Sequence, residues 1–322
     1  MKPAAFDYIR VDSLDEALEV LADPDLDAKV LAGGQSLIPM MNMRLAAPKT
    51  LLDVNGLAEL RAIQPHARDG PFGPAGPELR FGPAGAAGAG RETLRIGALV
   101  RQRELEREIA VDVRARLIYA ALTYIGHPQT RNQGTIGGSI AHADPAAELP
   151  LVFLTLGGTA TARSARGERR IPAEEFFLSV FMTALAAEEL LTAVELALPA
   201  EQEGVAFAEF RRRHGDFALI AAACVMAVDG DRNVERVRLG LGGVGETPQL
   251  LAAAQELVGQ PCTPQRAHDL ATALAEQLDL ANDLAASSAY RRQLVTVLVT
   301  GVLQAAYTDA LGKEGGHAAR RT

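Results

Sequence analysis

Two glycine-rich stretches carry the residue types that bind phosphate. In RNQGTIGGSIAHADPAAELP (131–150), Gly137 and Gly138 lie between the hydroxyl side chains of Thr135 and Ser139. Because glycine has no Cβ, we expect this backbone to adopt positive φ and to turn its N–H groups toward an anion. The two hydroxyls can add hydrogen bonds to phosphate oxygens or to a ribityl chain. The pattern favours a ligand that carries both phosphate and polyol.

A second glycine pair occurs earlier in the chain. A short predicted strand (28–31) runs directly into Ala32-Gly33-Gly34-Gln35-Ser36. Alone, such a Gly-Gly-x-Ser segment is typical of a tight turn between a strand and a helix. The presence of two similar loops in one chain favours a shared ligand.

Three further motifs are interpreted as not functional. The segment 240–245 matches G-x-G-x-x-G, but Pro248 begins the next predicted helix and no strand ends in a carboxylate about twenty residues later. The segment 137–141 nearly matches a hydrolase elbow with His142 close by, but Asp144-Pro145 interrupts the helix that an elbow needs. The three arginines at 211–213 lie on a predicted strand and are interpreted as solvated charge.

Composition excludes several classes of protein. The chain has 322 residues, enough for about two or three domains. Its net charge of −8, without a dense Lys/Arg cluster, argues against nucleic-acid and anionic-membrane surfaces. The first ten residues lack an apolar leader and the longest apolar run (217–228) is too short for a membrane span, so we expect a cytoplasmic protein. Two cysteines and scattered histidines argue against an iron–sulfur cluster or a metal site.

Hydrophobic periodicity predicts a chain of mixed helices and strands. We expect Ser13 to cap a helix with Glu16 as its partner, and Gly126 to end another. The segment 65–92, rich in Gly and Pro, is expected to be a surface loop without chemistry. The expected strands are 6–11, 28–31, 50–54, 94–99, 159–164, 169–171, 189–198, 205–213, 217–228 and 234–241. The remaining expected helices are 101–117, 115–125, 288–311 and two that begin at Thr247-Pro248 and Thr263-Pro264.

The two glycine stretches, AGGQSLIPMMNMRLAAPKTLLDVN (32–55) and RNQGTIGGSIAHADPAAELP, resemble the flavin-binding motifs of one family. This family is the FAD-carrying medium subunit of molybdenum hydroxylases, which include carbon monoxide dehydrogenase and xanthine dehydrogenase. The resemblance continues through RRRHGDFALIAAA, LGLGGVGETP and LAASSAYRRQLVTVLV, and so covers nearly the whole chain.

The resemblance implies an α+β fold of the vanillyl-alcohol-oxidase type. Two α/β subdomains, 1–60 and 61–176, would hold FAD between them. A C-terminal α+β domain of the CO dehydrogenase flavoprotein type, 177–322, would close over the flavin.

The resemblance also implies the FAD-binding residues. The pyrophosphate would lie between the two glycine loops. Glu148 matches a carboxylate that holds the adenosine ribose, Leu191 an apolar residue against the adenine, and Asp216 an acidic position near the isoalloxazine edge. One departure is Ala208-Glu209-Phe210, where some relatives carry a lysine. The residues implied to bind FAD are Leu31, Ala32, Gly33, Gly34, Gln35, Ser36, Leu37, Thr135, Gly137, Gly138, Ser139, His142, Asp144, Glu148, Leu191 and Asp216.

The implied activity is that of an oxidoreductase subunit in an electron relay. A molybdopterin-binding large subunit would oxidise the substrate, and a small [2Fe–2S] subunit would pass the electrons to this FAD for an external electron acceptor. The complex would be a heterotrimer that dimerises, and this chain would contribute no catalytic acid or base. The alternatives are a stand-alone flavin oxidase or dehydrogenase of the same fold, and a non-enzymatic nucleotide-binding protein.

Overall fold

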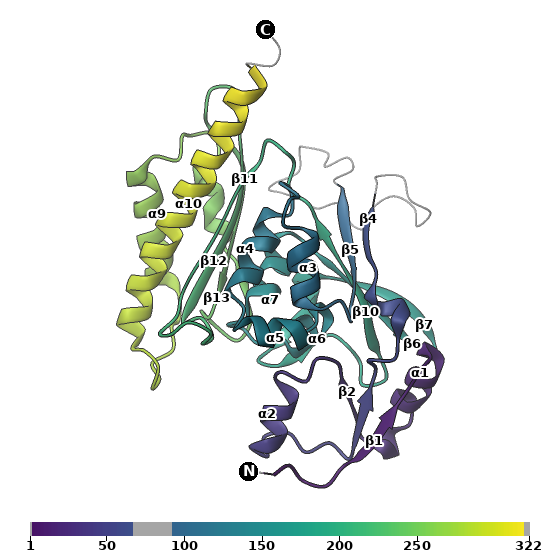
Figure 1. The fold of residues 1–322 in the computed structure, drawn as a ribbon. Coiled ribbons are helices and arrows are strands. Elements are labelled where there is room, and N and C mark those ends of the chain that lie inside the picture. Colours follow the sequence, from purple (N-terminus) through teal and green to yellow (C-terminus); the bar gives the residue numbers. More distant parts are fainter. Residues whose placement is uncertain (1, 67–91, 319–322) are drawn as a thin grey trace.

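The computed structural model describes residues 2–66 and 92–318. Most of the segment expected to be a surface loop, 65–92, therefore lies outside the described residues. The described chain forms three units that follow one another in sequence (Figure 1).

The first unit is a parallel sheet in the order β1-β3-β2. Its elements are β1 (Asp7–Arg10), α1 (Leu14–Ala22), η1 (Pro24–Leu26), β2 (Ala28–Leu31), α2 (Leu37–Asn42) and β3 (Thr50–Asp53). Ser13 caps α1 as expected, because its Oγ accepts a hydrogen bond from the Glu16 N–H at 3.3 Å. Leu31 pairs with Asp53 in the parallel register. The first glycine loop and the segment after β3 therefore leave the sheet at the same edge.

The second unit is an antiparallel sheet in the order β4-β5-β10-β6-β7, covered by helices. Its strands are β4 (Ile63–His66), β5 (Thr93–Gly97), β6 (Thr159–Ser164), β7 (Gly167–Pro172) and β10 (Leu190–Ala197), and a small hairpin is formed by β8 (Phe177–Ser179) and β9 (Met182–Thr183). Its helices are η2 (Ala58–Arg61), α3 (Gln102–Glu108), α4 (Arg116–Tyr124), α5 (Pro128–Gln133), α6 (Ile136–His142), α7 (Glu148–Thr155) and α8 (Ala173–Phe176). Buried residues of α4, α6 and α7 share one core with Ile96 of β5 and Val194 of β10.

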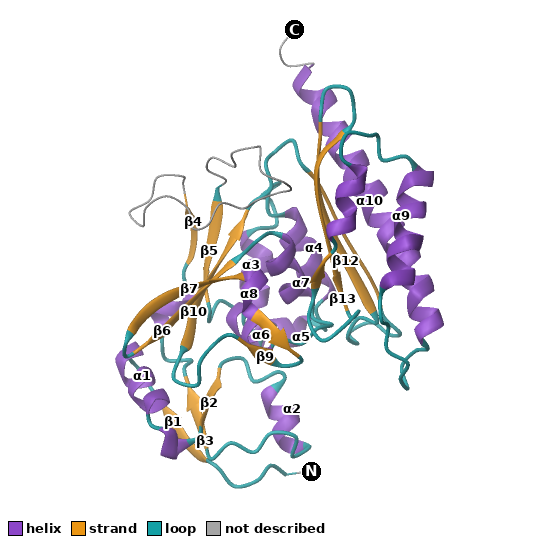
Figure 2. Cartoon of the chain, turned by 180° about the vertical axis from the view of Figure 1, so that it is seen from behind, coloured by secondary structure: helices purple, strands orange, loops and turns teal. Residues whose placement is uncertain are grey.

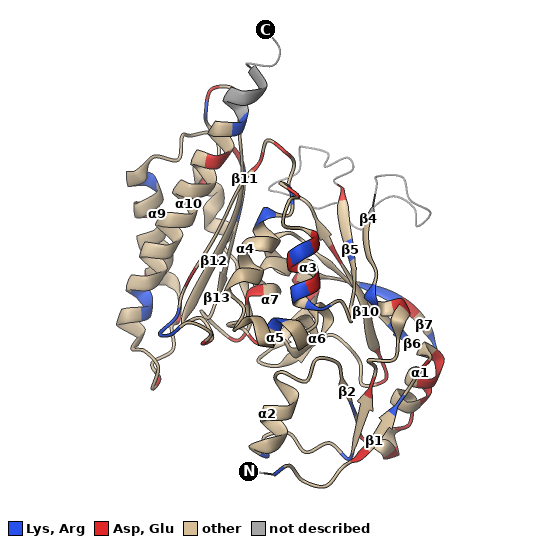
Figure 3. Cartoon of the chain, in the orientation of Figure 1, with Lys and Arg blue, Asp and Glu red and all other residues tan. Residues whose placement is uncertain are grey.

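The third unit is an antiparallel sheet in the order β11-β12-β13-β14 with two helices on its outer face. Its elements are β11 (Gly204–Phe210), β12 (Ile220–Val228), β13 (Val234–Gly242), β14 (Gln249–Leu250), η3 (Ala252–Leu257), α9 (Pro264–Gln277) and α10 (Ser288–Ala318). Alternate residues of β12 divide between two cores: Ala221 and Ala223 face the second unit, and Ala222 and Cys224 face α9 and α10. Burial on both faces explains why the predicted strand reads as one continuous apolar run. Charged residues gather along outer helices such as α1 and α3, and few lie along β12 (Figure 3).

One helix in the described ranges, Ser288–Lys313 within α10, has the length and apolar composition of a membrane span. It is also a core helix, because Val295, Val299 and Leu303 pack against the sheet in the core shared with α9. A soluble protein's core helix passes the same test of length and composition.

Three expectations about elements are wrong. The helix expected at 101–117 is interrupted: α3 ends at Glu108, and Asp112 Oδ1 accepts a hydrogen bond from the Arg114 N–H at 2.9 Å before α4 begins. This local bond competes with the helical one. No helix begins at Pro248, where the short strand β14 adds to the sheet instead. The strand expected at 205–213 ends at Phe210, so the three arginines lie in a loop.

Candidate functional site

The two glycine loops face each other at close range. A Cβ built on Gly33 would overlap the carbonyl oxygen of Gln133 and would lie 2.9 Å from Gly134 Cα. A Cβ on Gly138 would lie 3.9 Å from the Ala32 Cβ. The backbones can therefore approach this closely only because position 33 is glycine, whereas a Cβ at position 138 would make an ordinary van der Waals contact with Ala32. The arrangement places the loop after β2 directly below α5 and α6 in the view of Figure 1.

The first loop presents a row of unused backbone donors. Among the described residues, the N–H groups of Gly33, Gly34, Gln35 and Ser36 have no acceptor within the protein. Gly34 takes the left-handed conformation with φ of 68°. A hollow of about 340 Å³ opens at this loop and is lined by residues of 31–39. Successive N–H groups around a left-handed residue form a concave site for an anion, so this loop suits a phosphate.

The second loop is built differently from the expectation. Gly137 and Gly138 do not have positive φ; they belong to the first turn of α6, which Thr135 caps. Their N–H groups are occupied: Gly137 donates to Ala98 O at 2.9 Å and Gly138 donates to Thr135 Oγ1 at 3.0 Å. The expectation that these N–H groups point outward at an anion is therefore wrong, because the Thr135 hydroxyl caps a helix at this point. Gly137 is needed for packing, since a Cβ there would overlap Ala98 at the end of β5.

The wall beyond the second loop continues through His142 and Asp144. The His142 ring stacks on Phe181 with ring centroids 4.8 Å apart, and burial holds its pKa below the ordinary value of 6.5. Asp144 Oδ1 accepts a hydrogen bond from the Ala146 N–H at 2.9 Å, which caps the turn at Pro145. Phe181 also donates its N–H to Ala143 O at 3.3 Å.

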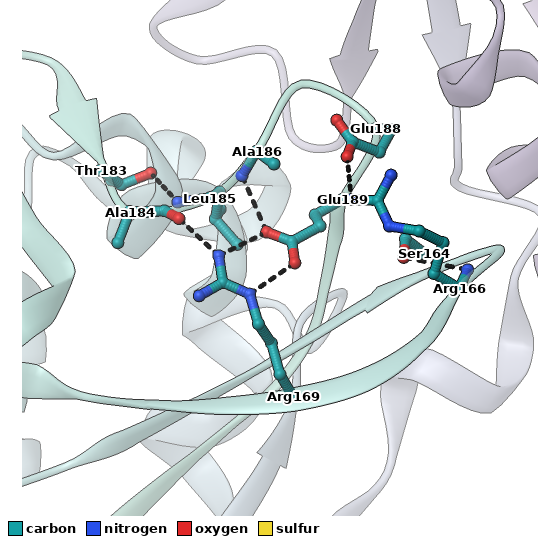
Figure 4. Close-up of polar contacts among 9 residues, drawn as sticks. All are labelled: Ser164, Arg166, Arg169, Thr183, Ala184, Leu185, Ala186, Glu188 and Glu189. Carbon is teal, nitrogen blue, oxygen red and sulfur yellow. Dashed lines mark hydrogen bonds and ion pairs between the residues drawn. The ribbon is translucent and has the colours of Figure 1, made fainter.

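The hairpin that carries Phe181 is anchored at its base by an ion pair. Arg169 on β7 contacts both carboxylate oxygens of Glu189, at 2.6 and 2.8 Å, and donates to Ala184 O at 2.6 Å (Figure 4). Glu189 also accepts from the Ala186 N–H at 2.7 Å. The hairpin strand β9 lies beside α6 (Figure 2). The sequence gives no signal that this hairpin lies beside His142, since Phe181 is in no recognisable motif.

Two buried carboxylates lie where the second and third units meet. Glu148 is the first residue of α7 and is 6% exposed, and burial raises its pKa to about 7. Burial, followed by the charge of Glu148, raises the pKa of Glu209 on β11 to about 8. Neither carboxylate oxygen of Glu209 has a hydrogen-bond partner in the described structure. Arg211 approaches it at 3.3 Å.

Arg211 is not a solvated charge, contrary to expectation. Its side chain is only 14% exposed, donates to Tyr124 O, and places its guanidinium 5.2 Å from the centroid of the Tyr124 ring. Arg212 and Arg213 are exposed, as expected of solvated charge.

Leu191 and Asp216 lie in different surroundings, one buried and one exposed. Leu191 is buried on β10 in the same core as Ile140 of α6. Asp216 is exposed on the loop between β11 and β12, beside Gly215, where an added Cβ would overlap the His127 ring. No polar contact in the described ranges joins the Asp216 side chain to either glycine loop.

Two residues that link the loops were missed. Asn55 Nδ2 donates to Ala32 O at 2.9 Å, and Arg101 donates to Asn55 Oδ1 at 2.7 Å and to Gln133 O. From the sequence, Asn55-Gly56 is simply a turn and Arg101 simply the start of a helix. No local signal could have joined residues so far apart in the chain.

Comparison with known proteins agrees with this geometry. Residues 4–75 and 87–199 match the family described as the FAD binding domain in molybdopterin dehydrogenase, and residues 205–306 match the CO dehydrogenase flavoprotein C-terminal domain. The chain is 36% identical to the 6-hydroxypseudooxynicotine dehydrogenase complex subunit alpha of Paenarthrobacter nicotinovorans, over 94% of this chain and 95% of that one. It is 30% identical to the carbon monoxide dehydrogenase medium chain of Hydrogenophaga pseudoflava, over 95% and 99% of the two chains.

Solved structures confirm the expected fold. A chain of carbon monoxide dehydrogenase from Hydrogenophaga pseudoflava superposes with a TM-score of 0.84 at 31% identity, covering 96% of this chain and 99% of that one. A chain of quinoline 2-oxidoreductase from Pseudomonas putida 86 gives a TM-score of 0.83 at 33% identity, with coverage of 96% and 99%. The chain therefore belongs to the FAD-binding subunits of the molybdenum hydroxylase family, is part of an oxidoreductase, and has FAD as its cofactor.

Proposed function

We propose that this chain is the electron-transfer subunit of a molybdenum hydroxylase. It takes electrons from the [2Fe–2S] clusters of a small subunit and passes them to an external acceptor, while a molybdopterin-binding large subunit oxidises the substrate. FAD supplies the chemistry, because its flavin exchanges electrons singly or in pairs. The names of the relatives, a complex subunit alpha and a medium chain, support a subunit role. The working complex is a heterotrimer that dimerises.

The main support for this proposal is the structure of the first glycine loop. Its four consecutive N–H groups without an acceptor form a concave anion site, and they bind the pyrophosphate of FAD. Thr135, Gly137, Gly138 and Ser139 form the facing wall, and Gly33 allows the first loop to lie close to the second. Ala32 to Ser36 make the contacts, and Leu31 and Leu37 hold the loop at its two ends.

The remaining residues contact the other parts of FAD. Glu148 holds the adenosine ribose; with its pKa raised to about 7 by burial, it can donate a proton as well as accept one in a hydrogen bond. His142 and Asp144 complete the same wall, and Leu191 lies against the adenine. Asp216, which is exposed, would lie near the isoalloxazine edge.

The domain division follows the sheets. The strand β10 pairs with β5 and β6 of the second unit, and the FAD-binding family match ends at residue 199. We propose units of 1–60, 61–199 and 200–322, with the second boundary after β10 in place of 176. We also assign the chain to the cytoplasm, which agrees with its two buried free cysteines.

Expression of the chain with and without partners tests the proposed function. The chain alone should purify with FAD but show no turnover with purines, aldehydes, carbon monoxide or N-heterocycles. Activity should appear when molybdopterin and [2Fe–2S] subunits are co-expressed. Substrate-dependent bleaching of the flavin in the isolated, metal-free chain would contradict the proposal and favour a stand-alone flavin oxidase.

A further inference from the structure

We infer that Arg101 and Asn55 are positioning residues for FAD: they form a brace that holds the two glycine loops at a fixed separation. Ala32 O accepts from Asn55 Nδ2 at 2.9 Å, Asn55 Oδ1 accepts from Arg101 Nη2 at 2.7 Å, and Arg101 Nη1 donates to Gln133 O. Hydrogen bonds thus run without a break from the first loop to the second. The inference rests on the proposed placement of FAD between these loops.

The orientation of Asn55 is fixed by its neighbours. Asp53 Oδ1 accepts from the Asn55 N–H at 2.9 Å and from Nδ2 at 2.6 Å. Asp53 is itself buried and accepts a hydrogen bond from the Tyr8 hydroxyl. The brace needs a donor toward Ala32 and an acceptor toward Arg101 on one short side chain, which an amide supplies and a carboxylate does not.

Arg101 is equally well fixed. Its backbone forms an isolated antiparallel bridge with Thr135, and the next residue, Gln102, donates its N–H to Gly134 O at 2.9 Å. Burial and the nearby charge of Arg61 lower the pKa of Arg101, but a guanidinium stays protonated in proteins. The brace therefore also places a half-buried positive charge beside the loops, where it favours an anionic ligand.

The brace acts where the two loops are closest. Arg101 donates to the same Gln133 carbonyl that faces the Cα of Gly33. Asn55 holds the Ala32 carbonyl, which immediately precedes the row of unused N–H groups. Without the brace, the first loop can rotate or move away, and its donors no longer converge on one anion. A lost charge-assisted hydrogen bond of this kind corresponds to about a tenfold or greater loss of affinity.

FAD titration of the flavin-free full chain tests the brace. Arg101→Gln and Asn55→Ala should each weaken the Kd for FAD by about tenfold or more, and the double variant should be little worse than either, because both remove the same connection. Arg114→Gln, which removes ion pairs to Glu92 and Asp112 away from the loops, should leave the Kd within twofold. Wild-type affinity in either single variant, or fully additive losses, overturns the inference.

Two measurements separate the brace from other causes. The melting temperature of the flavin-free variants is measured beside the Kd. If Arg101 and Asn55 only stabilise the fold, the variants have a lower melting temperature but an unchanged Kd for FAD, and this result overturns the inference. If Arg101→Gln does not fold, Asn55→Ala alone decides. The proposed FAD site is tested by Gly138→Val, since its Cβ would lie 2.7 Å from Thr135 Oγ1. If Gly138→Val binds FAD normally, the proposed FAD site is wrong. If Gly138→Val loses FAD binding while Arg101→Gln and Asn55→Ala keep the wild-type Kd, the site stands and only the brace is wrong.

Discussion

Glu209 on β11 and Glu148 on α7 are buried carboxylates from different units, and the charge of Glu148 helps to raise the pKa of Glu209. Burial raises the pKa of Glu148 to about 7, and burial together with the charge of Glu148 raises that of Glu209 to about 8. Glu209 faces the second unit because it alternates with Ala208 and Phe210, which pack against the core of the third unit. The two units therefore meet at carboxyl groups that hold their protons to a higher pH than an ordinary glutamate does.

Replacing Glu209 with Gln should change how stability depends on pH. Above pH 4.5, the ordinary pKa of Glu, the unfolded chain releases this proton while the folded chain keeps it. The wild type therefore loses stability from about pH 5 to about pH 8, and the loss ends once the folded carboxyl ionises. Glu209→Gln should remove the part of this trend that Glu209 causes, leaving that of Glu148, and gain about 1–3 kcal/mol at pH 8. Urea unfolding across this range measures it.

An exposed glutamate provides the control for that series. Glu168 lies on β7 and is exposed, so Glu168→Gln should follow the wild-type pH dependence. Equal pH profiles for wild type and Glu209→Gln would show that the Glu209 carboxyl is hydrated in solution.

Adding one methyl group at Gly33 should abolish FAD binding. The new Cβ would overlap the Gln133 carbonyl and press on Gly134, so Gly33→Ala must force the two loops apart. At Gly230, where a Cβ meets nothing within 4 Å, the same substitution should leave flavin content unchanged. The ratio of flavin to protein absorbance after purification measures both. Full flavin content in Gly33→Ala would contradict the close approach of the two glycine loops.

The glycine motifs were recognisable from the sequence, but the direction of their N–H groups was not. Thr followed by Ile-Gly-Gly is compatible with either a phosphate loop or a capped helix. In the structure it is a capped helix, because Thr135 Oγ1 accepts a hydrogen bond from the Gly138 N–H. The capping of α1 was predictable because it depends on neighbours in sequence. The division of β12 between two cores was not, because its residues form one continuous apolar run. The contacts of Arg101 with Asn55 and Gln133 join residues 46 and 32 positions apart, so they arise only from the fold.

Removing Phe181 should raise the pKa of His142. Burial is the main cause of the lowered value, and the Phe181 ring, stacked at 4.8 Å, covers one face of the imidazole. Phe181→Ala should therefore move the pKa toward 6.5, which NMR titration of the histidine ring protons measures. Leu178→Ala, on the same hairpin but without a ring contact to His142, is the control. An unchanged His142 pKa in Phe181→Ala would mean that the rings separate in solution.

Breaking the Arg169–Glu189 pair should loosen the hairpin that carries Phe181. Arg169 holds both Glu189 and the Ala184 carbonyl, so Arg169→Gln frees the base of the hairpin (Figure 4). Amide hydrogen exchange at Phe181 and Ala184 should then accelerate, because their acceptors, Ala143 O and Phe176 O, lie across the freed segment.

Arg166 offers a matched control on the same face. It pairs with Glu188, is 76% exposed and makes no contact with the hairpin in the described structure, so Arg166→Gln should leave exchange at both amides unchanged. Equal acceleration in the two variants would indicate a general loss of charge balance. No acceleration in Arg169→Gln would show that the stacking of Phe181 on His142 holds the hairpin without the ion pair.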